Sequence, residues 1–293
     1  MPAHLPHTRQ RSMFGLSLVE LMVGMTLGLI VILGLTILFS NTNRTRTEME
    51  KSGRLIENGR YALDLLSSHV KHAGFFDGYV GNQSVVPDPC SPGISDPGWT
   101  PVVVFDNAGA TTPVDATLPT CLTGQLSGTD AITLRSVSSE SWAVDTLPAT
   151  GNTFYFQARK CVSDAAPFVL TQTVGELNLR DATCLGNPAN ILPARRYFRD
   201  TFFIGTFNNI PTLMKLELGS ATPVPLVEGI ENMQIVYDAA TATVQISLLV
   251  RSTERSASLP VKSYVVGNET VTPSADFKRH VYSTSVVLRN PNS

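Results

Sequence analysis

The sequence contains few of the residues that most often perform catalysis or bind metals. Its 293 residues include five histidines and four cysteines, and no two cysteines form a CxxC pair. It also lacks a GxxxxGKS or GxxxxGKT segment and a GxGxxG segment, so neither common phosphate-binding loop is present. These absences argue against a zinc centre and against nucleotide-dependent chemistry. We therefore expect no metal, no cofactor and no enzymatic activity.

The histidines are poorly placed for a shared site. His69 and His72 are three residues apart, and the other three histidines are far from them in sequence. Two potential ligands without a third are more typical of a solvated helix face than of a metal site. We interpret both histidines as part of such a face.

Charged side chains are scarce as well, at 16% of the residues, and the formal net charge is only −2. A chain this close to neutral lacks the basic surface that nucleic-acid binding requires. The scarcity is greatest from Leu16 to Phe39, where Glu20 is the only charged residue among 24. As a helix this run is about 36 Å long, enough to cross a hydrocarbon core of about 30 Å. The run predicts a single membrane span.

A cleavable secretory signal is the alternative interpretation of this run. Its apolar region is normally about 7 to 15 residues long and ends in an A-x-A-like site. Here the run is longer and continues into "FSNTNRTRTE". Length and exit sequence therefore both favour a span that stays in the membrane.

Glu20 is the unusual feature of the span. An ionised carboxylate five residues into an apolar helix costs a few kcal/mol unless it reaches water or pairs with a cation. The span contains no cation, and the nearest one before it is Arg11. A cut after Gly15 would supply one, because Leu16 would then carry a new α-amino group.

The residues around Gly15 and Glu20 resemble a known signal sequence. A short basic leader, then "FGLSLVELM", with Glu at the fifth position after the Gly, resembles the class III signal of type IV pilins and type II secretion pseudopilins. The resemblance implies removal of residues 1–15 by a prepilin peptidase, which cuts between Gly15 and Leu16 and methylates the Leu16 amine. It also implies that Glu20 pairs with the amine of a neighbouring subunit during assembly. One departure is that the family usually begins its mature chain with Phe, whereas here Phe14 precedes the Gly.

The C-terminal third extends this resemblance. The segments "LVEGIENMQIVYD", "VQISLLVRS" and "RHVYSTSVVLRN" are similar to the pattern of the PilW family of minor pilins, in which a "VEGIE" turn or short helix feeds a strand. The resemblance implies a structural subunit that initiates or caps a type IV pilus and is held in the bacterial inner membrane before it enters the pilus near its tip. Its partners would be other minor pilins, the major pilin, the peptidase, the inner-membrane assembly platform and membrane lipid. A J-type pseudopilin of type II secretion and a membrane-tethered periplasmic binding module remain alternatives.

The fold class that we expect is α+β and pilin-like. Residues 16–39 form the transmembrane half of a long helix, and residues 40–74 form its amphipathic half, which ends at Gly74. The apolar residues at intervals of three and four in the second half predict the face that packs, namely Ile56, Leu63, Leu66 and Val70, together with Gly59. Gly24, Gly28 and Gly34 weaken the first half, which permits either a bend or close helix packing.

Residues 75–293 are predicted to form a β-rich periplasmic domain with long loops. Residues 75–128 are rich in Gly, Pro, Asp and Ser and predict an irregular region. Another long irregular segment is expected before the last strand. The antiparallel strands that we expect are Val102–Phe105, Ala131–Val137, Thr153–Gln157, Phe202–Phe207, Leu213–Leu218, Met233–Tyr237, Val244–Arg251 and Val281–Arg289.

The four cysteines, Cys90, Cys121, Cys161 and Cys184, all follow the span. An even number in loop-like sequence indicates two disulfides and an oxidising compartment such as the periplasm, which places the C-terminal domain outside the cytoplasm. Basic residues on both sides of the span leave its orientation open by charge alone. Three pairings are possible, and we favour the sequential one, Cys90 with Cys121 and Cys161 with Cys184. Four reduced thiols are the alternative.

Two further groups of residues have competing interpretations. Asp77, Asp88 and Asp96 carry oxygen ligands, but their spacing matches no calcium loop, so we interpret them as turn residues. Trp99 and Trp142 suit either an adhesive surface or a partly buried core, and the core is the more common environment for tryptophan.

Overall fold

The computed structural model describes residues 17–80, 100–106, 122, 124–148, 151–186, 190–256 and 259–290. The chain divides into two compact units, Met1–Glu50 and Lys51–Ser293. Several residues discussed above lie outside the described part, namely Gly15, Leu16, Asp88, Cys90, Asp96, Trp99 and Cys121. The predicted cleavage site and one of the two predicted disulfides are among them.

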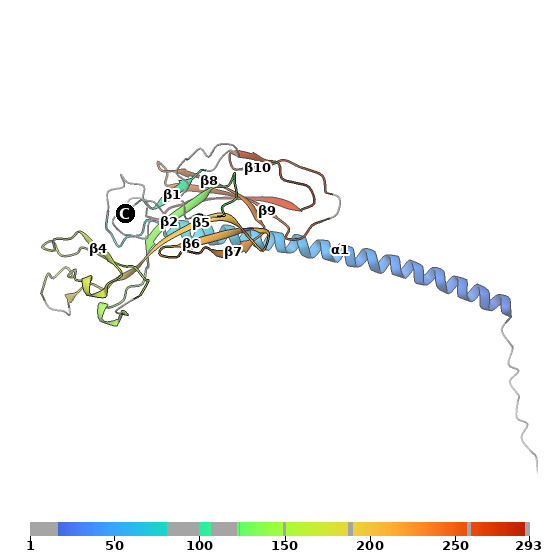
Figure 1. Ribbon diagram of the computed structural model, residues 1–293, viewed down its shortest axis with the longest axis horizontal. Helices are drawn as coiled ribbons and strands as arrows, with labels where there is room; N and C mark the ends of the chain where they lie inside the picture. The colour runs from blue at the N-terminus through green and yellow to red at the C-terminus, as the bar shows by residue number, and fades with distance from the viewer. Residues whose placement is uncertain are drawn as a thin grey trace, which may run out of the picture. The chain divides into compact units, whose positions relative to one another are not determined.

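A single helix, α1 (Leu18–His72), accounts for the described N-terminal part of the chain (Figure 1). It is uninterrupted at Gly24, Gly28 and Gly34. Its end follows the prediction, because Gly74 has a φ of +82°, a conformation that glycine adopts without strain. The Gly74 N–H then donates to the carbonyl of Arg135 at 2.9 Å, which fixes the helix end to a strand.

Antiparallel strands build the second unit (Figure 1). In the described residues, seven of them form one sheet in which β5 pairs with β2, β3 and β6. These strands are β1 (Val102–Phe105), β2 (Ala131–Val137), β3 (Tyr155–Ala158), β4 (Phe168–Thr171), β5 (Arg195–Phe207), β6 (Ile210–Glu217) and β7 (Val224–Glu228).

A second sheet has the order β12-β9-β8, and two short strands form a separate hairpin. The strands of the second sheet are β8 (Ile230–Asp238), β9 (Thr243–Arg251) and β12 (Arg279–Val287), and the hairpin strands are β10 (Tyr264–Val266) and β11 (Glu269–Val271). The turn between β7 and β8 contains Gly229 with a φ of +85°, so the predicted "VEGIE" element is a turn between two strands.

The main core lies where one face of α1 meets both sheets. The helix contributes Leu55, Ala62, Leu66 and Val70, Ala73 follows directly after it, and the sheets contribute side chains that alternate along their strands. From the large sheet these include Val102, Ile132, Leu134, Phe202, Ile204, Leu213 and Val227; from the small sheet they include Ile230, Met233, Val244, Ile246, Leu248, Val250 and Val286. Apolar burial of this extent is what holds the helix and the two sheets together.

The prediction of the helix face was partly wrong. Leu66, Val70 and Gly59 are buried as expected, but Ile56 is 43% exposed and its neighbour Leu55 is in the core. The buried positions follow intervals of four and three from Leu55, and Ile56 lies about 100° around the helix from that line. Leu55 and Ile56 fit the periodicity almost equally well, so the sequence did not show which of the two is buried.

The predicted strands exist, but the structure contains more. The bounds of β1 and β2 match the prediction, whereas β4, β7, β10 and β11 were not predicted. These four strands are three to five residues long, too short for a clear alternation. The strand predicted at Phe202 begins at Arg195, because the polar run before it pairs with β2 and β3.

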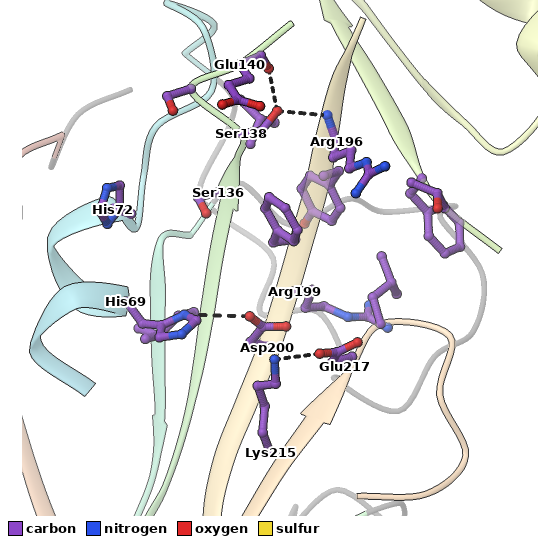
Figure 2. A pocket seen from close by; sticks show the side chains of 18 of the residues that line it. His69, His72, Ser136, Ser138, Glu140, Arg196, Arg199, Asp200, Lys215 and Glu217 are labelled. Atoms are coloured by element: carbon purple, nitrogen blue, oxygen red, sulfur yellow. Dashed lines mark hydrogen bonds and ion pairs between the residues drawn. The ribbon is translucent and has the colours of Figure 1, made fainter. Parts of the chain in front are cut away.

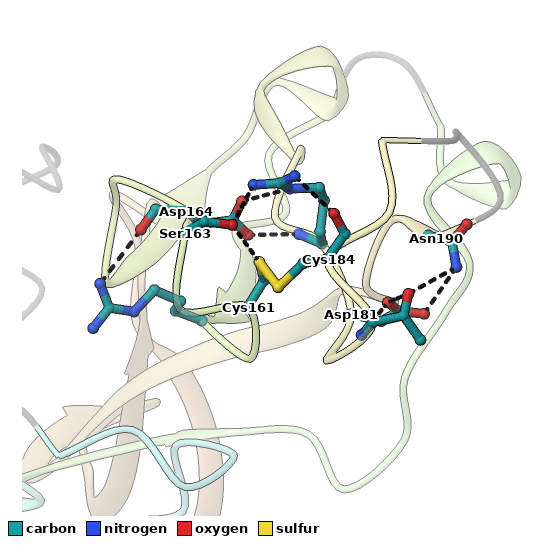
Figure 3. Close-up of a disulfide and its surroundings, with 9 residues drawn as sticks. Cys161, Ser163, Asp164, Asp181, Cys184 and Asn190 are labelled. Carbon is teal, nitrogen blue, oxygen red and sulfur yellow. Dashed lines mark hydrogen bonds and ion pairs between the residues drawn. A yellow bond between two sulfur atoms is a disulfide. The ribbon is translucent and has the colours of Figure 1, made fainter.

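A disulfide joins Cys161 to Cys184, the pair that the sequential pairing predicts (Figure 3). Beside it, the Asp164 carboxylate accepts hydrogen bonds from the backbone N–H of Arg180 at 2.8 Å and from its Nε at 2.7 Å. The Arg180 guanidinium also donates to the Cys184 carbonyl at 2.9 Å. The disulfide and this ion pair together close a loop that has little regular structure.

We predict that replacing both cysteines by alanine, Cys161→Ala with Cys184→Ala, lowers the free energy of unfolding by about 3 kcal/mol. The bond closes a loop of 23 residues, and its loss restores chain entropy to the unfolded state. Chemical denaturation of the oxidised proteins measures the change. Ser163→Ala leaves the bond intact and serves as the control; equal midpoints for the double variant and the wild type would contradict the prediction.

A second prediction concerns two glycines of α1. A Cβ at Gly59 would lie 2.5 Å from Cε2 of the Tyr282 ring, whereas a Cβ at Gly53 would meet nothing within 4 Å. We therefore expect Gly59→Leu to cost about 1–3 kcal/mol of stability by overpacking. Gly53→Leu is expected to be neutral or slightly stabilising, because leucine favours the helix. Denaturant unfolding of both variants tests this, and similar effects at the two positions would show that Tyr282 does not set the requirement for glycine.

Candidate functional site

The N-terminal part of α1 is the first candidate site. By length and composition it can cross a membrane, and its apolar side chains are exposed from Leu18, at 73%, to Phe39, at 70%. Nothing in the described residues covers them. Contiguous apolar surface of this size is unfavourable in water and marks contact with lipid or with another chain.

Polar groups inside this apolar segment are satisfied within the helix. The Thr26 hydroxyl donates to the Val23 carbonyl at 2.9 Å, and the Thr36 hydroxyl donates to the Ile32 carbonyl at 2.8 Å. In hydrocarbon an unpaired hydroxyl costs free energy, so these bonds make both threonines compatible with a bilayer. Among the side chains from Leu18 to Phe39, only the carboxylate of Glu20 brings a charge.

Glu20 lies in the first turn of α1, three residues into the helix. The free N–H groups and the positive end of the helix dipole favour a carboxylate at this position. In the described part of the chain Glu20 has no ion-pair partner. Leu16, whose amine the sequence suggests as the cation, lies outside the described residues.

The second candidate site is a pocket of about 670 Å³ in the β-rich unit (Figure 2). The last turns of α1 contribute Ser68, His69 and His72 to it, and the strands β5 and β6 contribute their charged side chains. Residues after β2, including Glu140 and Trp142, complete its rim.

The pairing of β5 with β6 brings the charged residues of this pocket together. Asp200 of β5 and Glu217 of β6 are directly opposed in the antiparallel register, and Lys215 lies two residues before Glu217 on the same face. The Lys215 ammonium and the Glu217 carboxylate form an ion pair at 2.5 Å. His69 reaches the pocket from α1, and its ring packs edge-on against Phe202 at 4.9 Å between ring centroids.

Burial dominates the electrostatics of the pocket. It raises the pKa of Asp200 to about 6, while attraction from Lys215 lowers that pKa and the charge of Glu217 raises it further. Burial also lowers the pKa of His69 to about 4, and the neighbouring charges of Lys215 and His72 act in the same direction. The two side chains are 3.6 Å apart, from His69 Nδ1 to Asp200 Oδ2. At neutral pH the histidine is therefore neutral and the aspartate is mostly ionised.

The sequence-based interpretation of the two histidines was half wrong. His72 is exposed, and its Nδ1 lies 2.7 Å from the Ser68 carbonyl, but His69 is half-buried against the sheet. Trp142 is also half-buried, with the Arg196 guanidinium 5.1 Å from its ring centroid. Asp77 has a φ of 55° in a turn, as interpreted, and its carboxylate pairs with Lys160 and Arg195.

Sequence reasoning did not find the pocket. Its central carboxylate is part of "RRYFRDTFF", which mixes charged and aromatic residues and did not suggest a strand until Phe202. A usable signal was present, because charged residues within an otherwise apolar strand often line a site rather than a surface. The opposition of Asp200 and Glu217 depends on the register of β5 with β6, which a single sequence does not give.

Searches of protein-family models, of curated proteins and of solved structures find no match to this chain. Function must therefore be argued from the residues themselves.

We predict that Asp200→Asn stabilises the protein at pH 7 by up to about 3 kcal/mol and has little effect at pH 4. The pKa of Asp200 is higher in the folded state, about 6, than the ordinary value of 3.8 for an aspartate, so the folded state binds the proton more tightly. The stability that protonation of Asp200 contributes is fully present below about pH 4 and is lost as the pH rises through 6. Asparagine removes the buried charge and its cost.

Thermal unfolding of both proteins between pH 4 and pH 7, in zwitterionic detergent, measures this difference. His69 titrates in the opposite sense: its lowered pKa contributes stability above about pH 6.5 that is lost as the pH falls through 4. Because both proteins contain His69, its effect cancels in the comparison. A difference that stays constant across this pH range would contradict the burial of the Asp200 charge.

Proposed function

We propose that this protein is a minor pilin, similar to the PilW family, that helps to initiate or cap a type IV pilus. The observation that carries the proposal is the order of Gly15, Leu16 and Glu20, with Glu20 in the first turn of a long apolar helix. A lone glutamate would be weak support. A basic leader, a glycine, and a carboxylate five residues later at the start of such a helix make up a specific combination.

The physical role of Glu20 follows from its surroundings. Leucine-rich helix surfaces slide past one another with little preference for axial position, since lipid is as apolar as the helix itself. A charge pair between Glu20 of one subunit and the Leu16 amine of the next would be worth about 4 kcal/mol at 4 Å and an effective dielectric of 20. That interaction would set the axial register of the incoming subunit.

The remaining features support the same proposal. The continuous helix, the antiparallel sheets and the Cys161–Cys184 disulfide suit a single-pass inner-membrane protein whose β-rich domain is periplasmic before assembly. The partners would be a prepilin peptidase that also methylates Leu16, the inner-membrane platform, the other minor pilins and the major pilin. Membrane lipid would surround the helix until it enters the filament.

The J-type pseudopilin of type II secretion is the closest alternative, because the same charge pair and helix would serve it equally well. A membrane-tethered binding module is the other alternative, and the pocket beside Asp200 is the feature that favours it. A deletion strain scored for surface pili and for secreted enzymes separates the first two. Lost secretion with normal pili would favour the pseudopilin.

We predict that Glu20→Ala is inserted and processed normally but enters pili at least about tenfold less than the wild type, because the register-setting charge pair is lost. Immunoblots of sheared pili and of membranes measure incorporation. Mass spectrometry of the membrane-bound protein checks that the chain begins at a methylated Leu16.

Glu50→Ala is the matched control, because Glu50 lies in the same helix beyond the apolar run and pairs only with Arg46 in the described chain, at 3.1 Å. It should incorporate normally. Unchanged incorporation of Glu20→Ala would remove the assembly role, and an intact leader on the native protein would remove the filament-subunit proposal altogether.

A further inference from the structure

The pocket beside α1 contains a buried carboxylate, Asp200, to which the described residues supply no hydrogen-bond donor. Asp200 is only 8% exposed, yet no described side chain or backbone N–H donates to its carboxylate. His69 Nδ1 is 3.6 Å from Asp200 Oδ2, which is beyond hydrogen-bonding distance (Figure 2). Lys215 is nearby but is engaged by Glu217. Because buried polar groups are nearly always hydrogen-bonded, the donors that Asp200 lacks within the described chain come from water or from a molecule bound in the pocket.

The charges that line the pocket indicate what kind of molecule this is. Acidic and basic side chains are present in equal number: Glu140, Asp200 and Glu217 against Arg196, Arg199 and Lys215. His69 adds no charge at neutral pH, since its pKa is lowered to about 4. An anion would face the carboxylates and a cation would face the basic groups. The lining therefore favours a neutral ligand with many hydrogen-bonding groups.

The pocket also has apolar walls. Phe198 is 41% exposed at the lining, and half-buried Trp142 lies on the rim. Ser68, Ser136 and Asn152 add hydroxyl and amide groups to the same lining. A lining that combines aromatic rings with hydrogen-bonding groups matches a sugar ring, which has C–H groups on its faces and hydroxyl groups around its edge. The volume of about 670 Å³ is within the range of small-molecule sites.

We propose that this pocket binds a short neutral saccharide, with Asp200 accepting hydrogen bonds from its hydroxyl groups and with Phe198 and Trp142 contacting its rings. The inference does not depend on the proposed filament role, because every residue that it uses belongs to the β-rich unit, Lys51–Ser293. In a filament subunit, such a site would add recognition of a glycosylated surface to a structural role.

The test uses the full chain in a zwitterionic detergent, because detergents with sugar head groups would compete for the pocket. An array of neutral oligosaccharides built from hexose and N-acetylhexosamine units is the first probe, with sialylated and sulfated glycans and polyamines as charged comparisons. We expect binding of at least one neutral glycan and weaker or no binding of the charged probes. Titration calorimetry with the best neutral glycan then gives the affinity.

Asp200→Asn is expected to weaken that affinity about tenfold or more, because a neutral amide replaces an acceptor of charge-assisted hydrogen bonds. Phe198→Ala is expected to weaken it as well. Asp145→Asn changes the same residue type at an exposed position outside the pocket and should bind like the wild type. Thermal unfolding checks that Asp200→Asn and Phe198→Ala remain folded, so a loss of binding is assigned to the pocket.

Three results would overturn the proposal. One is the absence of binding to any neutral glycan on the array. Another is a preference for the anionic glycans or the polyamines, which would identify a charged ligand instead. The third is equal affinity of Asp200→Asn and the wild type, which would place the glycan somewhere else on the protein.

Discussion

The contact between one face of α1 and both sheets is the interaction on which the second unit depends. Leu55, Ala62, Leu66 and Val70 contribute to a core that also receives side chains from the large and small sheets. Without that face, the two sheets would lose much of the apolar surface that each buries. Gly59 belongs to the same constraint, because only a residue without a side chain leaves room for the Tyr282 ring. The helix therefore has two different surroundings along its length, an uncovered apolar part and a part that completes a core.

The same packing creates the pocket. When Val70 enters the core, His69 is carried toward β5 and packs on Phe202, which leaves Asp200 behind it with little access to water. Burial raises the pKa of that carboxylate to about 6. The ionised Asp200 carboxylate thus lowers the stability of the folded protein, and it lies in a polar pocket whose volume suits a small molecule. Stability and binding are expected to oppose one another at this residue, as is common where a site is preorganised.

The sequence predicted those features that depend on local pattern. The apolar run, the helix end at Gly74, the bounds of β1 and β2 and the Cys161–Cys184 pair all follow from periodicity, glycine chemistry or loop composition. The short strands and the seven residues at the start of β5 were missed, because their alternation is brief or masked by arginines. The charged residues of β5 were a signal for a site, but its composition could not be predicted, since Asp200, Lys215 and His69 meet only through strand register and helix rotation. The proposed role of Glu20 depends on an amine at Leu16, which lies outside the described residues.

The place of β12 in the small sheet has a consequence for how the chain folds. This strand pairs with β9 along its whole length, and Val286 and Leu288 join core residues of α1 that are more than 200 positions earlier in the sequence. Contacts between such distant segments form slowly, because a long loop must close before they are made. The core on the hydrophobic face of the helix is therefore complete only after the chain has been made through Leu288. Until then part of its apolar surface stays exposed, and such surface favours aggregation.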